Sequence, residues 1–232
     1  MNNSGTLWII PTPLGNLSDF STRILGTLRT LQVIAAEDTR QCRKIYSHFM
    51  IPSPRIIRCD ESKERKAAQE VIECLKQGLN VGFLTDAGTP SISDPGWRLV
   101  DSVTEAGHLV LPLAGPSAVT TALSVCHFPT TPFTFVGFLD RKEGKRKKQM
   151  TFMFEQQGAC VFFESPHRIQ RTMKELLEFD PTRQAVIGRE MTKKFEEYMR
   201  GNLTEVEKLI SQKKPMGEYT IVIAASTMKT KS

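Results

Sequence analysis

Short apolar segments alternate with segments of helical period through the first half of the chain. Strands are expected at Leu7–Pro11, Val33–Glu37, Arg55–Arg58, Val81–Thr85 and Leu109–Leu113. Between them, apolar residues recur at spacings of three and four, as in Ile24, Leu28 and Leu31, which predicts helices. Gly78 and Gly107 follow two of these helices as C-caps, and Asp60 stands at an expected N-cap. Strands that alternate with helices predict a parallel sheet in an α/β fold.

The composition of the sequence changes near residue 135, where a strongly basic segment begins to replace the alternation of apolar and helical segments. Between Arg141 and Lys148 the chain carries six basic residues (Arg141, Lys142, Lys145, Arg146, Lys147 and Lys148) and one acid, Glu143. We expect the segment VGFLDRKEGKRKKQ (136–149), which contains these residues, to form an exposed loop and helix start, acting either as a solvated linker or as an arm that contacts RNA. Further strands are expected at Cys160–Glu164, Gln184–Gly188 and Tyr219–Ala225, with helices near Ile169–Phe179 and Leu203–Gln212. The chain is therefore predicted to form two α/β domains, residues 1–115 and 116–232.

Composition narrows the classes of protein that remain. A hydrophobic content of 40% in 232 residues is enough for real cores. The five cysteines are scattered without a CxxC pair, which argues against a disulfide framework or a metal site. The absence of a long apolar run or a signal sequence favours the cytoplasm and no membrane partner. The net charge of +6 suits an anionic partner such as nucleic acid.

The twelve residues TDAGTPSISDPG, Thr85 to Gly96, follow one predicted strand directly. They combine glycine, proline and small polar residues with one large apolar residue, Ile92. Ligands bind in α/β folds at the carboxyl ends of strands, so this loop is predicted to hold a polar small molecule.

Two further loops have a similar position after a strand. PTPLGN, Pro11 to Asn16, lacks the GxGxxG fingerprint of dinucleotide-binding folds, and the chain has no GxxxxGK[ST] phosphate loop. In AGPSA, Ala114 to Ala118, Ser117 stands at an N-cap position, where free amides can meet a ligand carboxylate. All three loops are expected to gather at one sheet edge.

Six segments, in this order and spacing, resemble the tetrapyrrole methylase superfamily. They are PTPLGN, AAEDTR (35–40), TDAGTPSISDPG, LAGPSA, FFESPHR (162–168) and REMTKKFEE (189–197). Within the superfamily they are most similar to the branch that methylates the ribose 2′-hydroxyl of a cytidine in small-subunit ribosomal RNA. The resemblance implies a two-domain homodimeric methyltransferase that binds S-adenosylmethionine between its domains.

The resemblance also implies the residues of the cofactor site. They are Pro13, Gly15, Asp86, Ala87, Gly88, Thr89, Pro90, Asp94, Gly115, Pro116, Ser117 and Ala118. S-adenosylmethionine carries a sulfonium and an ammonium against one carboxylate. Asp86 and Asp94 are the acids best placed to offset this positive charge, and helix-start amides can take the carboxylate.

For the chemistry, a base must reach the ribose hydroxyl, and Asp38 at the end of the second strand is predicted as that base. Asp38 equally suits a structural role as the cap of a helix at Thr39–Phe49. Lys193 is predicted to orient the ribose or phosphate. The predicted substrate-binding residues are Glu164, Ser165, His167, Arg168, Arg189, Glu190 and Lys194.

The sequence departs from the family pattern at IRCDES (57–62) and at Met216, among other places. Two other functions therefore stay open. The same fold can methylate a carbon of a tetrapyrrole, although such an enzyme has no need of the basic segment. A non-catalytic module that binds RNA or senses a ligand is the second alternative.

Overall fold

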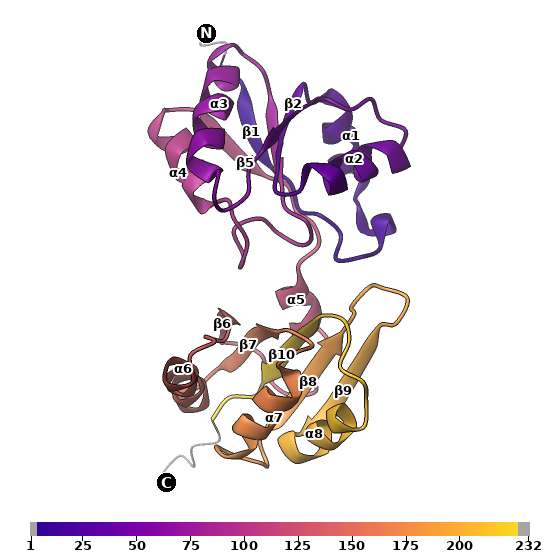
Figure 1. Cartoon of the computed structure of the whole chain (residues 1–232), viewed down its shortest axis with the longest axis vertical. Helices are drawn as coiled ribbons and strands as arrows, with labels where there is room; N and C mark the ends of the chain where they lie inside the picture. The colour runs from indigo at the N-terminus through magenta and orange to yellow at the C-terminus, as the bar shows by residue number, and fades with distance from the viewer. Residues whose placement is uncertain (1–3, 227–232) are drawn as a thin grey trace. The chain divides into compact units, whose positions relative to one another are not determined.

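The computed structural model describes residues 4–226 of the chain (Figure 1). The chain divides into two compact units, Met1–Ser117 and Ala118–Ser232. Each unit has its own five-stranded sheet. Within residues 4–226, no helix has both the length and the apolar character that crossing a bilayer requires.

The first unit is built on a parallel sheet in the order β3-β2-β4-β1-β5. Its strands are β1 (Thr6–Ile9), β2 (Val33–Ala36), β3 (Arg55–Arg58), β4 (Val81–Leu84) and β5 (Leu109–Pro112). Its helices are η1 (Leu17–Asp19), α1 (Thr22–Thr30), α2 (Thr39–His48), α3 (Glu64–Lys76) and α4 (Trp97–Glu105). The five predicted strands are confirmed, with ends that differ by at most two residues.

Burial on both faces of the sheet explains why the inner strands β2 and β4 are continuously apolar. All four residues of β2 and of β4 are buried. One core joins the sheet to α3 and α4, and a second core joins it to α1 and α2, which lie on the other side in Figure 1. Strands covered on both faces are typical of parallel sheets.

Of the caps predicted at Gly78, Gly107 and Asp60, the two glycines are confirmed. Gly78 and Gly107 adopt φ of +79° just beyond α3 and α4, the left-handed conformation that favours glycine. The prediction for Asp60 is wrong, because α3 begins at Glu64 with Lys63 at its N-cap. Asp60 instead accepts hydrogen bonds from the backbone N–H groups of Ser62 and Lys63, so it closes the turn before the helix.

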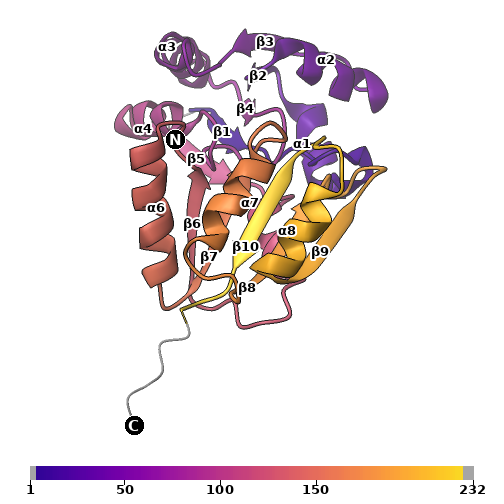
Figure 2. The same cartoon turned by 60° about the horizontal axis from the view of Figure 1, so that its bottom comes forward.

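The second unit has a mixed sheet in the order β6-β7-β10-β8-β9. Its strands are β6 (Phe133–Phe138), β7 (Ala159–Glu164), β8 (Gln184–Arg189), β9 (Glu197–Asn202) and β10 (Tyr219–Ile223). Its helices are α5 (Ala118–Leu123), α6 (Glu143–Glu155), α7 (Ile169–Leu177) and α8 (Leu203–Ser211), and Figure 2 shows α7 and α8 side by side across the sheet. The predicted second α/β unit is confirmed.

Two strands of this sheet were not predicted, β6 and β9. They form its two edges, where one side of a strand lacks a neighbour. Met199 is the one buried residue of β9, and Gly137 is the one buried residue of β6, which also contains a register shift. The expectation of a loop from residue 136 was therefore wrong as far as Phe138, because the apolar end of β6 was grouped with the basic segment that follows it. β9 is half exposed and lacks the apolar signal of an inner strand.

Candidate functional site

The three loops predicted to meet after β1, β4 and β5 do lie together in the first unit. These strands are neighbours in the sheet. The backbones of Thr12 and Gly88 exchange two hydrogen bonds, with N···O distances of 2.8 and 2.7 Å. Thr89 Oγ1 donates to the carbonyl oxygen of Pro116 at 3.0 Å. A Cβ on Gly115 would lie 2.9 Å from the Cβ of Pro11, so glycine is needed for this close approach.

The cradle formed by these loops contains features that suit a bound polar ligand. Gly88 has φ of +77°, which a residue with a side chain rarely adopts. The Oγ1 of Thr12 is buried and has no hydrogen-bond partner within residues 4–226. A buried hydroxyl without a partner is costly, and a ligand with polar atoms can supply that partner. The residues present therefore fit a cofactor such as S-adenosylmethionine.

Carboxylates gather beside this cradle, at the carboxyl ends of β2 and β4. The Glu37 side chain accepts a hydrogen bond from the backbone N–H of Asp86 at 3.3 Å. Burial raises the pKa of Glu37 and also that of Asp86, which is further raised by the charge of Asp38. Burial and the nearby Glu37 raise the pKa of Asp94 to about 6, although Thr85 Oγ1 donates to Asp94 at 3.2 Å. Near neutral pH this group of acids favours positive charge nearby.

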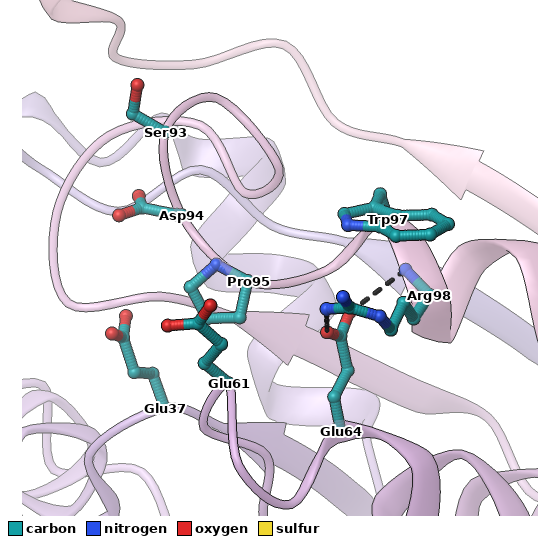
Figure 3. A pocket seen from close by; sticks show the side chains of 8 residues that line it. All are labelled: Glu37, Glu61, Glu64, Ser93, Asp94, Pro95, Trp97 and Arg98. Carbon is teal, nitrogen blue, oxygen red and sulfur yellow. Dashed lines mark hydrogen bonds and ion pairs between the residues drawn. The ribbon is translucent and has the colours of Figure 1, made fainter. Parts of the chain in front are cut away.

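A pocket of about 290 Å³ opens onto these acids (Figure 3). Glu37, Glu61 and Asp94 line one part of it, and Figure 3 shows Trp97 on the opposite side above Arg98. Glu61 was not predicted as a site residue. It lies in the IRCDES stretch, which departs from the family pattern, so no motif pointed to it.

Glu64 forms the structural wall of this pocket. One carboxylate oxygen, Oε1, accepts from the N–H groups of Gly96, Arg98 and Leu99 at 2.8, 3.0 and 3.2 Å, and Oε2 accepts from Arg98 Nη1 at 3.3 Å. The Arg98 guanidinium in turn lies 4.6 Å from the centre of the Trp97 ring. Glu64 on α3 thus caps the start of α4, a role that only the packing of two helices reveals.

Asp38 caps α2, as its alternative interpretation predicted. Its carboxylate accepts from the backbone N–H of Arg40 at 2.7 Å and from the Arg40 guanidinium at 3.2 and 2.8 Å. These bonds lower the pKa of Asp38 to about 2. The carboxylate is therefore ionised at neutral pH, and its assignment as the base stays a prediction.

The ESPHR and REMTKK segments meet at one end of the second sheet, where β7 and β8 stop and β10 begins. Tyr219 of β10 pairs in register with Glu164 of β7 on one side and with Arg189 of β8 on the other. Glu164 is buried and accepts from Thr172 Oγ1 at 2.7 Å and from the backbone N–H of Ser165 at 2.8 Å. The Arg168 Nε lies 3.2 Å from Glu164 Oε1, and His167 is exposed.

Lys193 is held between two carboxylates in the turn after β8. Its Nζ lies 3.0 Å from Glu190 Oε1 and 2.9 Å from Glu218 Oε2. Burial opposes the charge of Lys193, but the two carboxylates outweigh it and keep the pKa of Lys193 above its usual value. Lys194 is exposed and lies 5.7 Å from the ring centre of Phe195. Glu218 was not predicted, because its partners lie far from it in the sequence.

The basic segment was predicted to be exposed, and this prediction is wrong for Arg146. Its guanidinium is buried and binds Glu175 through Nε at 2.6 Å and Nη2 at 2.7 Å. Its Nη1 donates to the carbonyl oxygens of Asp140 and Arg141. The other five basic residues of the segment are exposed, from Arg141 to Lys148. Within residues 4–226, no cluster of three or more His, Cys, Asp or Glu side chains suits a metal ion.

Comparison with known proteins identifies the class to which this fold and site belong. The family model for tetrapyrrole (corrin/porphyrin) methylases matches residues 6–207, so the chain belongs to that family. The predicted S-adenosylmethionine-dependent methyltransferase is thereby confirmed, together with its α/β fold class.

Two curated relatives define the similarity further. Ribosomal RNA small subunit methyltransferase I of Bacillus subtilis is 37% identical over 225 residues, which is 97% of this chain and 77% of that protein. The protein of the same name from Thermotoga maritima is 40% identical and covers 95% of this chain and 98% of its own length.

Solved structures share the fold at low sequence identity. Diphthine synthase aligns with a TM-score of 0.73 at 14% identity, covering 97% of this chain and 91% of that chain. Uroporphyrin-III C-methyltransferase of Thermus thermophilus, complexed with S-adenosyl homocysteine, aligns with a TM-score of 0.63 at 16% identity. The alignment covers 94% of this chain and 97% of that chain.

Proposed function

We propose that this chain transfers a methyl group from S-adenosylmethionine to the ribose 2′-hydroxyl of a cytidine in small-subunit ribosomal RNA. The observation that carries this proposal is the 37–40% identity, over nearly the whole chain, to proteins named ribosomal RNA small subunit methyltransferase I. The exposed basic residues between Arg141 and Lys148 support an anionic substrate of this kind.

For the cofactor, we assign the loops after β1, β4 and β5. The proposed contacts are Pro13, Gly15, Asp86, Ala87, Gly88, Thr89, Pro90, Asp94, Gly115, Pro116, Ser117 and Ala118. The methyl group of bound S-adenosylmethionine is already electrophilic, so the residues of the chain need mainly to position the two reactants. Asp86 and Asp94, with Glu37 beside them, favour the positive charge of the donor.

For the RNA, we assign the edge where β7 and β8 end. Lys193 keeps its positive charge there and suits the orientation of a phosphate or ribose oxygen rather than proton removal. The proposed substrate surface is completed by residues at and just after the ends of β7 and β8. They are Glu164, Ser165, His167, Arg168, Arg189, Glu190 and Lys194. Asp38 is the proposed proton acceptor, ionised and held in place by Arg40.

Transfer of labelled methyl groups tests this function directly. The purified chain is incubated with labelled S-adenosylmethionine and small ribosomal subunits that lack the modification, and digested RNA is separated into nucleosides. We expect label in 2′-O-methylcytidine. Label on a base or on a different ribose would refute the proposed reaction, and label only in an added porphyrinoid would instead favour tetrapyrrole methylation. Uptake of the cofactor without transfer to any acceptor would indicate a non-catalytic module.

We further propose that the enzyme acts in the cytoplasm as a homodimer. Ribosomal RNA is the partner that this location provides. Sedimentation of the purified chain at several concentrations tests the dimer, and a single species with the mass of one 26.1 kDa chain would refute it.

A further inference from the structure

The second unit contains a pocket that joins part of the proposed substrate surface, Glu164, Ser165 and Arg168, to the start of the basic segment. It has a volume of about 600 Å³ and lies where β6 and β7 end and where α6 and α7 begin. Phe138, Arg141 and Lys142 line it from the β6–α6 side, and Glu164 and Arg168 line it from the β7–α7 side. The pocket therefore combines an aromatic ring with several charged groups.

The aromatic ring of the pocket is both exposed and held in place. Phe138 is 53% exposed, although it is a large apolar residue. Phe163 packs edge-on against it with ring centres 5.5 Å apart, and Phe135 packs against Phe163 at 5.0 Å. A ring that is positioned by neighbours and yet open to solvent is suited to stacking, because little side-chain entropy remains to be lost. Nucleic-acid bases present a π face for such stacking.

The charges of the pocket leave a positive excess at its rim. The Glu164 carboxylate is paired with Arg168, whose Nη2 also donates to the carbonyl oxygen of Leu139 at 2.7 Å. Asp140 accepts from the backbone N–H of Lys142 at 2.7 Å and lies 3.9 Å from Lys145 Nζ. The acids are thus already compensated.

Two cations remain for a ligand. Arg141 and Lys142 are exposed, and neither side chain has an ion-pair partner within the part of the chain that the structure describes. The pocket of the first unit has the opposite character, because Glu37, Glu61 and Asp94 make it acidic. Charge complementarity therefore selects an anionic occupant for the pocket of the second unit.

We propose that this pocket binds one unpaired nucleotide of the RNA substrate, with its base against Phe138 and its phosphate on Arg141 and Lys142. The inference rests on the proposed function and deepens it, because it requires an RNA segment that is single-stranded where it meets the enzyme. Bases can stack on a protein ring only when they are unstacked from their own helix. The full positive charge of two side chains at one rim matches the phosphate that accompanies each base.

Two pocket variants and two matched controls test this inference. Phe138→Leu keeps an apolar side chain without a π face, and its control is Phe133→Leu, a similarly exposed phenylalanine at the other end of β6. The double variant Arg141→Gln/Lys142→Gln removes the two cations. Its control, Lys174→Gln/Lys208→Gln, removes the same charge from exposed positions on α7 and α8. Affinity for a fluorescent single-stranded oligoribonucleotide is measured by anisotropy across a salt series, and methyl transfer is measured with unmodified small subunits.

We expect Phe138→Leu to weaken binding of the oligoribonucleotide about tenfold, in the range of one lost stacking contact. The double variant is expected to reduce the slope of log affinity against log salt by about 0.7, since this is the contribution of one neutralised phosphate of a single strand. KM for the subunits should rise while affinity for S-adenosylmethionine stays unchanged, and both controls should behave as the original chain.

The outcomes separate the inference from the function on which it rests. If the original chain methylates RNA but both pocket variants match their controls, the pocket is not a nucleotide site and the inference is overturned. If the original chain takes up S-adenosylmethionine but neither binds nor methylates RNA, the proposed function fails together with the inference. Arg141 and Lys142 are exposed, so the double variant stays informative even if Phe138→Leu does not fold.

Discussion

Replacement of Arg146 by methionine is expected to destabilise the second unit. The methionine keeps an unbranched apolar chain about as long as the aliphatic part of arginine but removes the guanidinium group, its charge and all its hydrogen bonds. The side chain is only 4% exposed, and its loss leaves two carbonyl oxygens without this donor and Glu175 without its main partner. Removal of one partner from a buried ion pair costs about 3–5 kcal/mol. Glu175 is 21% exposed and keeps Arg171 at 2.8 Å, so we expect about 2–3 kcal/mol here.

Hydrogen exchange read by mass spectrometry measures this loss in the right part of the molecule. Both tryptophans, Trp8 and Trp97, lie in the first unit, so tryptophan fluorescence would not report on the second. A loss of about 2–3 kcal/mol accelerates exchange of the buried amides of β10 by about 30- to 140-fold, because about 1.4 kcal/mol corresponds to a factor of ten. Lys148→Met, an exposed position on the same helix, is the control and should change stability by less than about 0.5 kcal/mol.

The effect of pH provides a second check on the same pair. The Arg146 guanidinium holds the pKa of Glu175 below its usual value of 4.5. A lowered pKa stabilises the folded state above the usual value, and this contribution is lost as the pH falls through the lowered pKa. The difference between the original chain and Arg146→Met should therefore shrink in acid. If exchange of β10 in Arg146→Met equals that in Lys148→Met while RNA affinity falls, Arg146 acts as an RNA ligand and the structural reasoning is refuted.

Three further outcomes are expected. Gly115→Ala should weaken binding of S-adenosylmethionine, measured by calorimetry, at least about fivefold, because the added Cβ would collide with Pro11. The control Gly26→Ala, within α1, places its Cβ in open space and should raise the free energy of unfolding by about 0.5–1 kcal/mol. Equal affinity in Gly115→Ala and the original chain would contradict the close approach of the loops. The pKa of Asp94 is raised from its usual 3.8 to about 6, so ionisation of this carboxyl increasingly opposes folding as the pH rises through this range. Asp94→Asn should therefore raise the melting temperature above pH 6 and have little effect below pH 3.8. An equal gain in melting temperature at both pH values would exclude the ionisation of Asp94 as its cause. Asp38→Asn should reduce turnover far more than affinity for S-adenosylmethionine, and unchanged turnover would remove Asp38 from the mechanism.

Much of the first unit was predictable from local sequence. Continuous apolar runs such as Val33–Ala36 and Val81–Leu84 are buried on both faces, so the pattern and the burial agree. The loop residues after β1, β4 and β5 also follow from the sequence, because glycine and proline report backbone requirements directly. Of the edge strands, β9 escaped prediction because it is half exposed, and β6 because its apolar end was grouped with the basic segment that follows it.

The site shows the same division at the level of single side chains. The cap formed by Asp38 was predictable because the carboxylate and the amide that it binds lie two residues apart. The cap formed by Glu64 on α4 was not, because its partners begin 32 residues further along the chain. Lys193 was found through a motif, whereas Glu218, 25 residues away, was found only when the two turns were seen side by side.

The amino-acid sequence by itself determined the α/β class, the inner strands and the polar loops that follow them, since each depends on residues close together in the chain. Only the tertiary structure decided which charges are available to a ligand. Arg146 and Arg141 look equivalent in a basic segment, yet one is buried against Glu175 and the other is exposed at a pocket. The physical reason is that charge compensation depends on distances between side chains, and folding sets these distances across segments that the sequence keeps apart.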